Sequence, residues 1–349
     1  MNYNLRNQSN NQQGITLVEL MVAMVIGLLL TAGVLQLFSS NKQTYRVTEN
    51  MSRLQENARF AMHFLTKDIR MAGYMGCAGQ SSTLTNTLDD STSSFLYGFS
   101  DIVEGFEATS SSVWAPTVDS SITSPLGGSD IIAIRGISSL SIPITGQPSN
   151  SGDCTSSASH TANIKVSDAG SLTTGDIVIA TNCTNTSIFQ VTNTNLVTDT
   201  VAHNTGGSVT PGNTTTNLGA CYAESGQLSQ METKVFFIKN NPTTGRPSLY
   251  LKVNDKASQE LVEDIENMQI IYGEDSNGDG APNFYKPANL VDMSKVVAVR
   301  VAIVAVTFDD NVTETTNSYS ILGGSTITPT DKRIRRVFTS TIVIRNRLP

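Results

Sequence analysis

Charged residues are scarce in this chain of 349 residues, in which Asp, Glu, Lys and Arg together make up 15%. The formal net charge of −7 lacks the excess of Lys and Arg that nucleic-acid-binding proteins direct at phosphates. The three histidines stand apart from one another, and the sequence has no HExxH motif, no GxSxG motif and no phosphate-binding loop. We therefore expect neither direct binding to nucleic acid nor an enzyme.

The sequence has one long, mainly apolar run, residues 15–38, and no proline interrupts it. As a helix, about 24 residues reach about 36 Å at about 1.5 Å per residue, which is enough to cross a bilayer core of about 30 Å. Arg6 is the only charged side chain in the preceding segment, residues 1–14. Because positive charge holds a flanking segment in the cytoplasm, we expect the remainder of the chain to be exported.

Two residues make the apolar run unusual: Gly14 directly precedes it, and Glu19 lies inside it. A secretory signal normally has its small-residue cleavage site after the apolar region, whereas cleavage after Gly14 would leave the apolar helix on the mature protein. A carboxylate within a membrane helix costs on the order of 3 kcal/mol, so Glu19 needs a partner or a function. Cleavage would create a cationic amine at Ile15, which Glu19 could neutralise. The alternative is that Glu19 lies near the interface and extends toward water.

The helical pattern continues past the apolar run, because no proline or glycine occurs between Gly33 and Gly73. Apolar residues recur there at spacings of three or four, with charged residues between them. We expect one helix over residues 15–71, about 85 Å long, whose second half, within residues 39–72, is amphipathic and packs on a sheet. The apolar positions in this half are Met51, Leu54, Ala58, Ala61, Leu65 and Ile69.

Beyond Gly79 the sequence is rich in Ser, Thr and Asn, with short β-branched runs between turn residues. We expect strands at 130–135, 176–180, 188–192, 234–239, 248–253, 268–273, 296–307 and 337–345. The last two are long and rich in Val and Ile, so we expect both to be central in the main sheet. Residues 81–127, 141–162 and 193–228 are polar, and we expect long surface loops or irregular β-insertions.

These expectations give an α+β fold class, with a long N-terminal helix packed on an antiparallel sheet. We divide the chain into a leader at residues 1–14, a membrane helix at 15–38 and an amphipathic helix at 39–72. A β-rich insertion lobe follows at 73–228, and a β-sheet domain at 229–349 completes the chain.

Four cysteines lie on the side of the membrane that we expect to be exported: Cys77, Cys154, Cys183 and Cys221. An even number in an oxidising compartment predicts two disulfides, for which three connectivities are possible. The sequence does not choose among them, although the pairs Cys77–Cys154 and Cys183–Cys221 close the shorter, non-nested loops and are slightly favoured. No CxxC spacing or neighbouring histidine supports a zinc site.

A possible calcium loop occurs at residues 275–280, which read DSNGDG. Asp275, Asn277 and Asp279 place oxygen ligands at alternate positions, and the glycines allow a turn. An EF-hand would have glutamate at the twelfth position, where this sequence has Lys286. We weigh an incomplete calcium site against a plain acidic turn stabilised by bonds from the side chains to the backbone, and favour the turn.

The N-terminal run GITLVEL (14–20) resembles the type III signal of type IV pilins and their secretion-system relatives. The resemblance implies that a prepilin peptidase cleaves between Gly14 and Ile15 and methylates the new amino group of Ile15. It also implies that Glu19 pairs with such an amine between subunits and sets their axial register. Many pilins have phenylalanine at the position of Ile15, and major pilins usually have a proline in the apolar helix. These two departures favour a minor subunit.

Further stretches resemble the PilW family of minor pilins and extend over nearly the whole chain. They are QENARF (55–60), DIRMAGY (68–74), GC (76–77), GD (175–176), IFQV (188–191), SLY (248–250), YGED (272–275) and the ending, 335–347. The resemblance implies a pilin-like fold and a scarce subunit that joins other minor pilins, the major pilin and a large adhesin at the pilus tip. That complex would prime pilus assembly at the inner-membrane platform and support twitching motility, adhesion or DNA uptake.

The resemblance also implies a location. The chain would cross the bacterial inner membrane once, with its N-terminus in the cytoplasm and its head in the periplasm, before it enters the pilus tip. Residues 331–349 contain six basic residues and Asp331. We interpret this basic end as the charged edge of a sheet that docks onto partner pilins.

Three alternatives stay open. A type II secretion pseudopilin shares the N-terminal signal, but the long β insertion and the C-terminal resemblance argue against it. A signal-anchored periplasmic enzyme would need a clustered polar pocket that the sequence does not indicate. A signal-anchored, calcium-dependent adhesin would use the loop at residues 275–280.

Overall fold

The computed structural model describes residues 14–77, 83–89, 94–99, 101–149, 152–154, 161–206, 209–223 and 225–347. The expected leader, residues 1–14, lies outside this part of the chain except for Gly14. The chain divides into two units, residues 1–52 and residues 53–349. We call the second unit the head.

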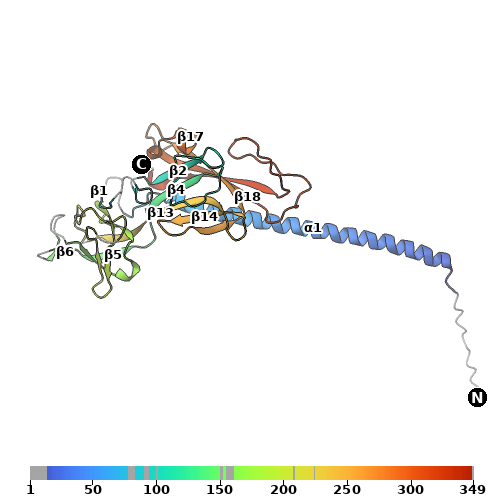
Figure 1. The fold of residues 1–349 in the computed structure, drawn as a ribbon, viewed down its shortest axis with the longest axis horizontal. Coiled ribbons are helices and arrows are strands. Elements are labelled where there is room, and N and C mark those ends of the chain that lie inside the picture. Colours follow the sequence, from blue (N-terminus) through green and yellow to red (C-terminus); the bar gives the residue numbers. More distant parts are fainter. Residues whose placement is uncertain are drawn as a thin grey trace, which may run out of the picture. The chain divides into compact units, whose positions relative to one another are not determined.

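One long helix, α1 (Leu17–Arg70), is shared by the two units, and it confirms the predicted continuous helix (Figure 1). The part of α1 within the head has a stripe of apolar side chains that are at most 1% exposed: Leu54, Ala58, Ala61, Leu65 and Ile69. Their spacing of three or four residues places them on one face of the helix. The helix is therefore amphipathic here, as the sequence predicts, and its apolar face packs into the head.

A left-handed glycine follows the end of α1. Gly73 has a φ of +73°, and its N–H donates a hydrogen bond of 2.7 Å to the carbonyl of Arg135. A Cβ at this position would come within 2.6 Å of Ile102 Cδ1. Glycine is therefore required by both the backbone conformation and the close approach, and the chain leaves the helix there.

The largest sheet contains thirteen strands of the described part of the chain. They are β1 (Thr83–Asn86), β2 (Val103–Ala108), β3 (Trp114–Ala115), β4 (Ile131–Ile137), β5 (Ile142–Gly146), β8 (Asn163–Val166), β9 (Ile177–Thr181), β10 (Asn185–Gln190), β11 (Asn193–Asn195), β12 (Thr200–Ala202), β13 (Gln227–Asn240), β14 (Pro247–Val253) and β15 (Gln259–Glu263). The main path is β1-β10-β9-β13-β5-β8-β12-β11. Two branches extend from β13, one through β4 to β2 and β3, and one through β14 to β15.

The long strand β13 joins two groups of strands. Its residues 227–230 pair with β9, and residues 227–228 also pair with β5. Its residues 231–236 pair with β4 on one side, and residues 234–240 pair with β14 on the other. The division that we expected between residues 228 and 229 therefore falls inside one strand.

A second sheet has the order β17-β16-β18-β19, formed by β16 (Ile265–Glu274), β17 (Phe284–Lys286), β18 (Val296–Val306) and β19 (Arg335–Val343). The prediction that both long C-terminal strands are central in the main sheet is wrong for β19, which is an edge strand. β18 is central, but in the four-stranded sheet and not in the largest one. All residues of β18 except Arg300 are buried, whereas exposed residues recur along β19. Composition alone did not separate the two, because both strands are rich in β-branched residues.

Each strand expected from the sequence is present, and several more lie in segments expected to be loops or irregular insertions. β2 contributes the buried Phe106 to one apolar cluster, and β5 contributes Ile142 and Ile144 to another. These strands are short and carry few large apolar residues, so their pattern in the sequence is weak. Short elements complete the described structure: the hairpin strands β6 (Pro148–Ser149) and β7 (Gly152–Asp153), and the 3₁₀ turns η1 (Ala169–Ser171), η2 (Ala288–Leu290), η3 (Met293–Lys295) and η4 (Arg345–Arg347).

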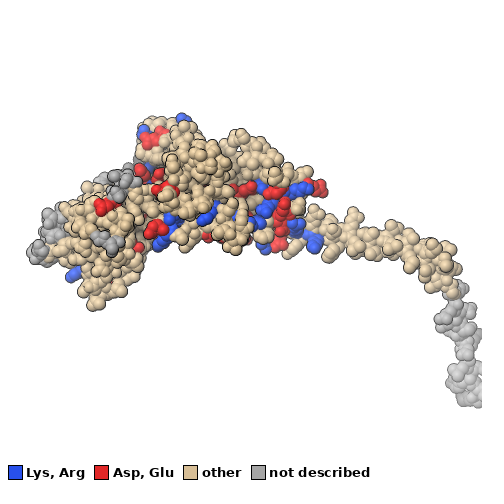
Figure 2. Space-filling view, in the orientation of Figure 1, with Lys and Arg blue, Asp and Glu red and all other residues tan. Residues whose placement is uncertain are grey.

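Charged side chains are sparse on the visible face of the lobe that contains β1, β5 and β6 (Figures 1 and 2). This distribution agrees with the Ser, Thr and Asn residues that dominate the sequence of that lobe. The apolar cluster of β5, β8, β9, β10 and β12 gives the lobe its own core.

Two disulfides are present, and both differ from the slightly favoured pairing. Cys77 bonds to Cys183 with a Cα–Cα distance of 4.8 Å, and Cys154 bonds to Cys221 with a Cα–Cα distance of 5.9 Å. The pairs Cys77–Cys154 and Cys183–Cys221 are therefore wrong. Cys183 lies in the turn between β9 and β10, and the sheet brings this turn beside the segment that follows α1. Loop length along the sequence does not contain that information.

Candidate functional site

The start of α1 combines the three N-terminal residues that the sequence singled out. Gly14 and Ile15 precede the helix, and Glu19 lies in its first turn. The Ile15 side chain is 77% exposed, and a Cβ added at Gly14 would meet no atom within 4 Å. The peptide bond between Gly14 and Ile15 thus lies outside the helix, between two exposed residues.

Thr16 and Glu19 form a capping box at this helix start. The Glu19 N–H donates to Thr16 Oγ1 at 3.3 Å, and Glu19 Oε2 accepts from the Thr16 N–H at 3.1 Å and from Thr16 Oγ1 at 3.0 Å. These bonds satisfy backbone donors that the first turn of a helix leaves unpaired. The sequence analysis missed this interaction, although a Thr-x-x-Glu pattern ahead of an apolar run is the usual signal for it.

The first unit presents apolar side chains on all sides of α1. From Leu17 to Phe38 its large apolar residues are between 52% and 75% exposed. α1 is also the one helix in the described part of the chain that is long and apolar enough to cross a membrane. Such a surface needs cover from lipid or from other helices.

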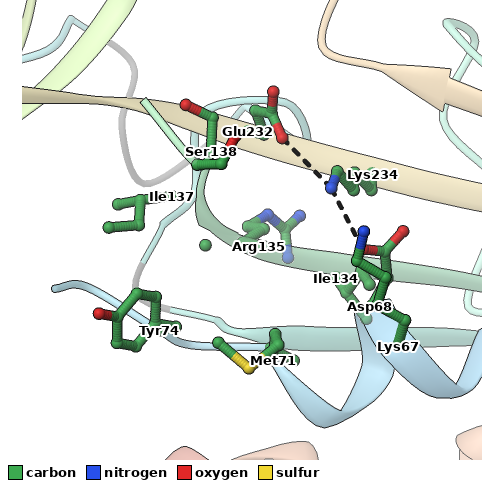
Figure 3. Close-up of a pocket in the computed structure, with 13 residues that line it drawn as sticks. Lys67, Asp68, Met71, Tyr74, Ile134, Arg135, Ile137, Ser138, Glu232 and Lys234 are labelled. Carbon is green, nitrogen blue, oxygen red and sulfur yellow. Dashed lines mark hydrogen bonds and ion pairs between the residues drawn. The ribbon is translucent and has the colours of Figure 1, made fainter. Parts of the chain in front are cut away.

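A groove of about 500 Å³ lies in the head between the last turns of α1 and the strands β4 and β13 (Figure 3). Its lining mixes apolar side chains, such as Met71 and Ile137, with charged ones. Lys234 Nζ lies 3.2 Å from Asp68 Oδ1 and 3.3 Å from Glu232 Oε2. Burial of the ammonium group acts to lower the pKa of Lys234, but the two carboxylates outweigh this effect and raise the pKa. The charges therefore pair with one another and fasten β13 to α1.

Arg135, whose side chain is buried, is one of the residues that line this groove. Its guanidinium donates to the carbonyls of Asp101 and Phe95 at 2.7 and 2.6 Å, and to Glu104 Oε2 at 2.8 Å. It also lies 5.3 Å above the centre of the Phe95 ring. These contacts balance a charge that would be costly to bury alone, so Arg135 holds β4 against the neighbouring loop.

Asp130 is a buried carboxyl group between the two sheets. It is 2% exposed, and its oxygens accept from the Ala108 N–H at 2.9 Å and from the Ile270 N–H at 2.7 Å. Its own N–H donates to the Met268 carbonyl at 2.8 Å. Burial, reinforced by the charge of Glu107, raises the pKa of Asp130 to about 7. Asp130 therefore links β2 and β4 of the large sheet to β16 of the small one.

The expected calcium ligands lie in one turn after β16. Asp275 Oδ1 accepts from the N–H groups of Asn277, Gly278 and Asp279 at 3.2, 2.6 and 3.3 Å, and Oδ2 accepts from Gly280 at 2.7 Å. Desolvation acts in the opposite direction, but these bonds lower the pKa of Asp275. Within the described residues, no group of three or more His, Cys, Asp or Glu side chains is placed to hold a metal ion. Asp275 stabilises the turn, and calcium binding there stays a prediction.

The basic C-terminal end separates into paired and unpaired charges. The Arg335 guanidinium lies 2.6 Å from both Glu266 Oε2 and Asp331 Oδ1, and its side chain is buried. Arg336 and Arg345 are exposed, and neither forms an ion pair with another described residue. Arg336 and Arg345 thus provide unpaired positive charge beside β19.

Comparison with known families gives two matches. A model described as Type IV Pilus-assembly protein W matches residues 235–346, which include the whole second sheet. A model described as Prokaryotic N-terminal methylation motif matches residues 9–35, which include Gly14, the capping box and the first part of α1. No curated protein and no solved structure matches the chain.

Proposed function

Since the chain belongs to the PilW-type type IV pilus proteins, we propose that it is a minor pilin acting in a tip complex that primes pilus assembly. A prepilin peptidase cleaves it between Gly14 and Ile15 and methylates Ile15. Its work is structural, and its partners are other minor pilins, the major pilin, a large tip adhesin and the inner-membrane assembly platform. The complex supports twitching motility, adhesion or DNA uptake.

The observation that carries this proposal is the Thr16–Glu19 capping box beside the exposed Gly14–Ile15 bond. Cleavage leaves both Thr16 donors in place, because the Thr16 amide lies downstream of the new terminus. Glu19 Oε2 receives both of those bonds, whereas Oε1 has no partner among the described residues. Oε1 is therefore free to accept from a cationic amine on its own or a neighbouring chain.

The apolar first part of α1 supports the two environments that such a subunit occupies. In the inner membrane, lipid covers the exposed side chains, and the N-terminus stays in the cytoplasm because Arg6 is positive. In the pilus, the helices of neighbouring subunits replace the lipid. The two disulfides fit a head that folds in the oxidising periplasm.

Two substitutions test the N-terminal assignment by mass spectrometry of the membrane-extracted protein and by counting pili. Gly14→Val leaves an unprocessed precursor, because the residue before the cut must be small. Glu19→Ala keeps cleavage and methylation but impairs incorporation and pilus initiation, because the buried amine loses its carboxylate. Glu56→Ala is the matched control, since Glu56 is an exposed acid on the head part of α1.

Either of two results would contradict the proposal. A mature mass for Gly14→Val would remove the cleavage site. Normal piliation with Glu19→Ala would show that Glu19 serves only as a helix cap.

A further inference from the structure

Among the strands that the structure describes, the edges of the head are short or covered, with one exception. The described strands that pair on one side only and have between two and five residues are β1, β3, β6, β7, β11, β15 and β17. β15 is also contacted by α1, because Asn57 Nδ2 donates to the Glu263 carbonyl at 3.2 Å. β19 has nine residues and pairs with β18 alone. Proteins normally protect a long edge, because unpaired backbone groups invite another strand.

Between Val337 and Val343, β19 lacks the usual means of protecting an edge. It contains no proline or lysine, and its pairing with β18 is continuous, without a bulge. The middle of the strand reads Thr-Ser-Thr, which is uncharged and favourable for a sheet. Nothing in this stretch opposes the addition of a further strand.

The register identifies the backbone groups that point outward. In an antiparallel pair, alternate residues turn N–H and C=O toward the partner, and the residues between them turn these groups away. The Ile344 N–H donates to the Val297 carbonyl at 2.9 Å, so even-numbered residues face β18. The residues that point outward are Val337, Thr339, Thr341 and Val343. Their N–H and C=O groups have no hydrogen-bond partner among the described residues.

The outward edge is accessible and has positive charge at both ends. Thr339, Thr341 and Val343 are exposed, Val343 at 43%. The exposed Arg336 and Arg345 flank this stretch, which is about 24 Å long at about 3.4 Å per residue. An incoming strand therefore finds backbone partners in the middle and cations at each end.

We propose that β19 receives an added strand from a different exported protein. The incoming segment is extended, has about seven uncharged, β-branched-rich residues and has an acidic residue at each end. A second copy of this chain is disfavoured. Antiparallel pairing of two β19 edges would bring Arg336 of one copy next to Arg345 of the other, and like charges repel there. The proposal concerns the head and does not depend on cleavage at Gly14.

Photo-crosslinking in the producing bacterium tests the proposal with the full-length chain. A photoreactive amino acid replaces Val343 on the open edge, and a second one replaces the exposed Lys286 on β17 as a control. We expect a crosslink from position 343 to another exported protein, and peptide mapping should place it in an extended segment with acidic ends. The crosslink should persist in a Gly14→Val background, which separates this test from that of the proposed function. No crosslink, a crosslink to a second copy, or a segment without acidic ends would overturn the proposal.

Proline substitution tests the backbone bonds themselves. Thr339→Pro removes one outward N–H and no bond to β18, and edge strands tolerate proline at such positions. Thr339→Val keeps the N–H and a similar shape. We expect about tenfold less crosslinking at position 343 with proline and unchanged crosslinking with valine. Equal yields from both variants would contradict the added strand.

A charge-reversal variant keeps the test decisive if Thr339→Pro lowers the melting temperature. Arg336→Glu combined with Arg345→Glu changes two exposed side chains that pair with no described residue. We expect this double variant to reduce crosslinking about tenfold, because its glutamates would repel an acidic strand. An unchanged yield would overturn the charge complementarity on which the choice of partner rests.

Discussion

The two parts of α1 have the same secondary structure and opposite surroundings. In residues 17–38 the large apolar side chains are exposed, as Leu29 shows at 69%. In residues 53–70 the apolar stripe is buried, and Leu65 is 0% exposed. Local sequence produces the helix in both parts, because no proline or glycine interrupts the second and apolar residues fill the first. Helix formation does not determine what covers the helix. The head covers the apolar stripe of residues 53–70, whereas the cover for the apolar first part has to come from outside the chain.

The difference also explains why the two parts have different patterns. A helix covered by a sheet on one side needs one apolar face, and the apolar residues of the second part recur at spacings of three or four residues. A helix surrounded by lipid or by other helices needs apolar residues all round. The spacing of the apolar residues therefore indicates what kind of surface covers a helix, even where the structure does not contain that surface.

The largest expected difference between the two parts of α1 is in how a charged residue introduced into each part affects the stability of the head. Leu65→Asp places a carboxylate in the packed core of the head and should destabilise it by more than about 4 kcal/mol. Leu29→Asp should leave the melting temperature of the head unchanged, but it should lower membrane insertion by about 3 kcal/mol. Thermal melting in detergent and membrane fractionation measure the two effects. A head that melts normally with Leu65→Asp would show that the stripe is not its core.

The disulfide that follows α1 gives the next largest effect, because it ties the covered part of the helix to the hairpin of β9 and β10. Replacing Cys77 and Cys183 together with serine should destabilise the head by about 2–4 kcal/mol. The single variant Leu29→Ala in the exposed part should change the stability of the head by less than about 0.5 kcal/mol. Non-reducing peptide mapping of the parent protein checks the pairing. Peptides that join Cys77 to Cys154 would contradict it.

The sequence predicted where the helix and the strands lie along the chain better than it predicted which of them lie side by side. The amphipathic spacing of Leu54 to Ile69 located the covered part of α1, and β-branched runs located β18 and β19. Such patterns report how many faces of an element are buried, but they do not report which strand lies beside it. For this reason β19 was expected at the centre of the sheet, and Cys77 was assigned the wrong partner. In both cases the answer depends on contacts between residues far apart in the sequence.

Part of the candidate site could be predicted from the sequence. Gly14, Ile15 and Glu19 stand together in the sequence, so their proximity follows from the first turn of a helix. The bonds between Thr16 and Glu19 were also readable, because they use a local pattern. The role of Asp130 could not be predicted from the sequence. The sequence placed it at the start of the strand expected at 130–135, and only the packing of β16 against it makes it a buried link between sheets.

Asp130 gives a pH dependence confined to the head, with a smaller effect per pH unit than the loss of the disulfide. Its pKa is raised to about 7 from an ordinary value of 3.8, so between these values the folded head retains a proton that the unfolded chain has released. The free energy of unfolding should therefore fall as pH rises through this window, by about 1 kcal/mol per unit from this group.

Other carboxyl groups of the head titrate in the same measurement, so the useful quantity is the difference between the parent protein and Asp130→Asn. Asparagine cannot ionise, although it keeps one acceptor oxygen for Ala108 or Ile270. The variant should be less stable at pH 5, because one of those two N–H groups loses its acceptor, and the gap should narrow toward pH 7. Leu29→Ala, in the part of α1 without cover, should keep the parent's pH profile. Parallel profiles for the parent and Asp130→Asn would assign the pH dependence to other groups and leave Asp130 ionised between the sheets.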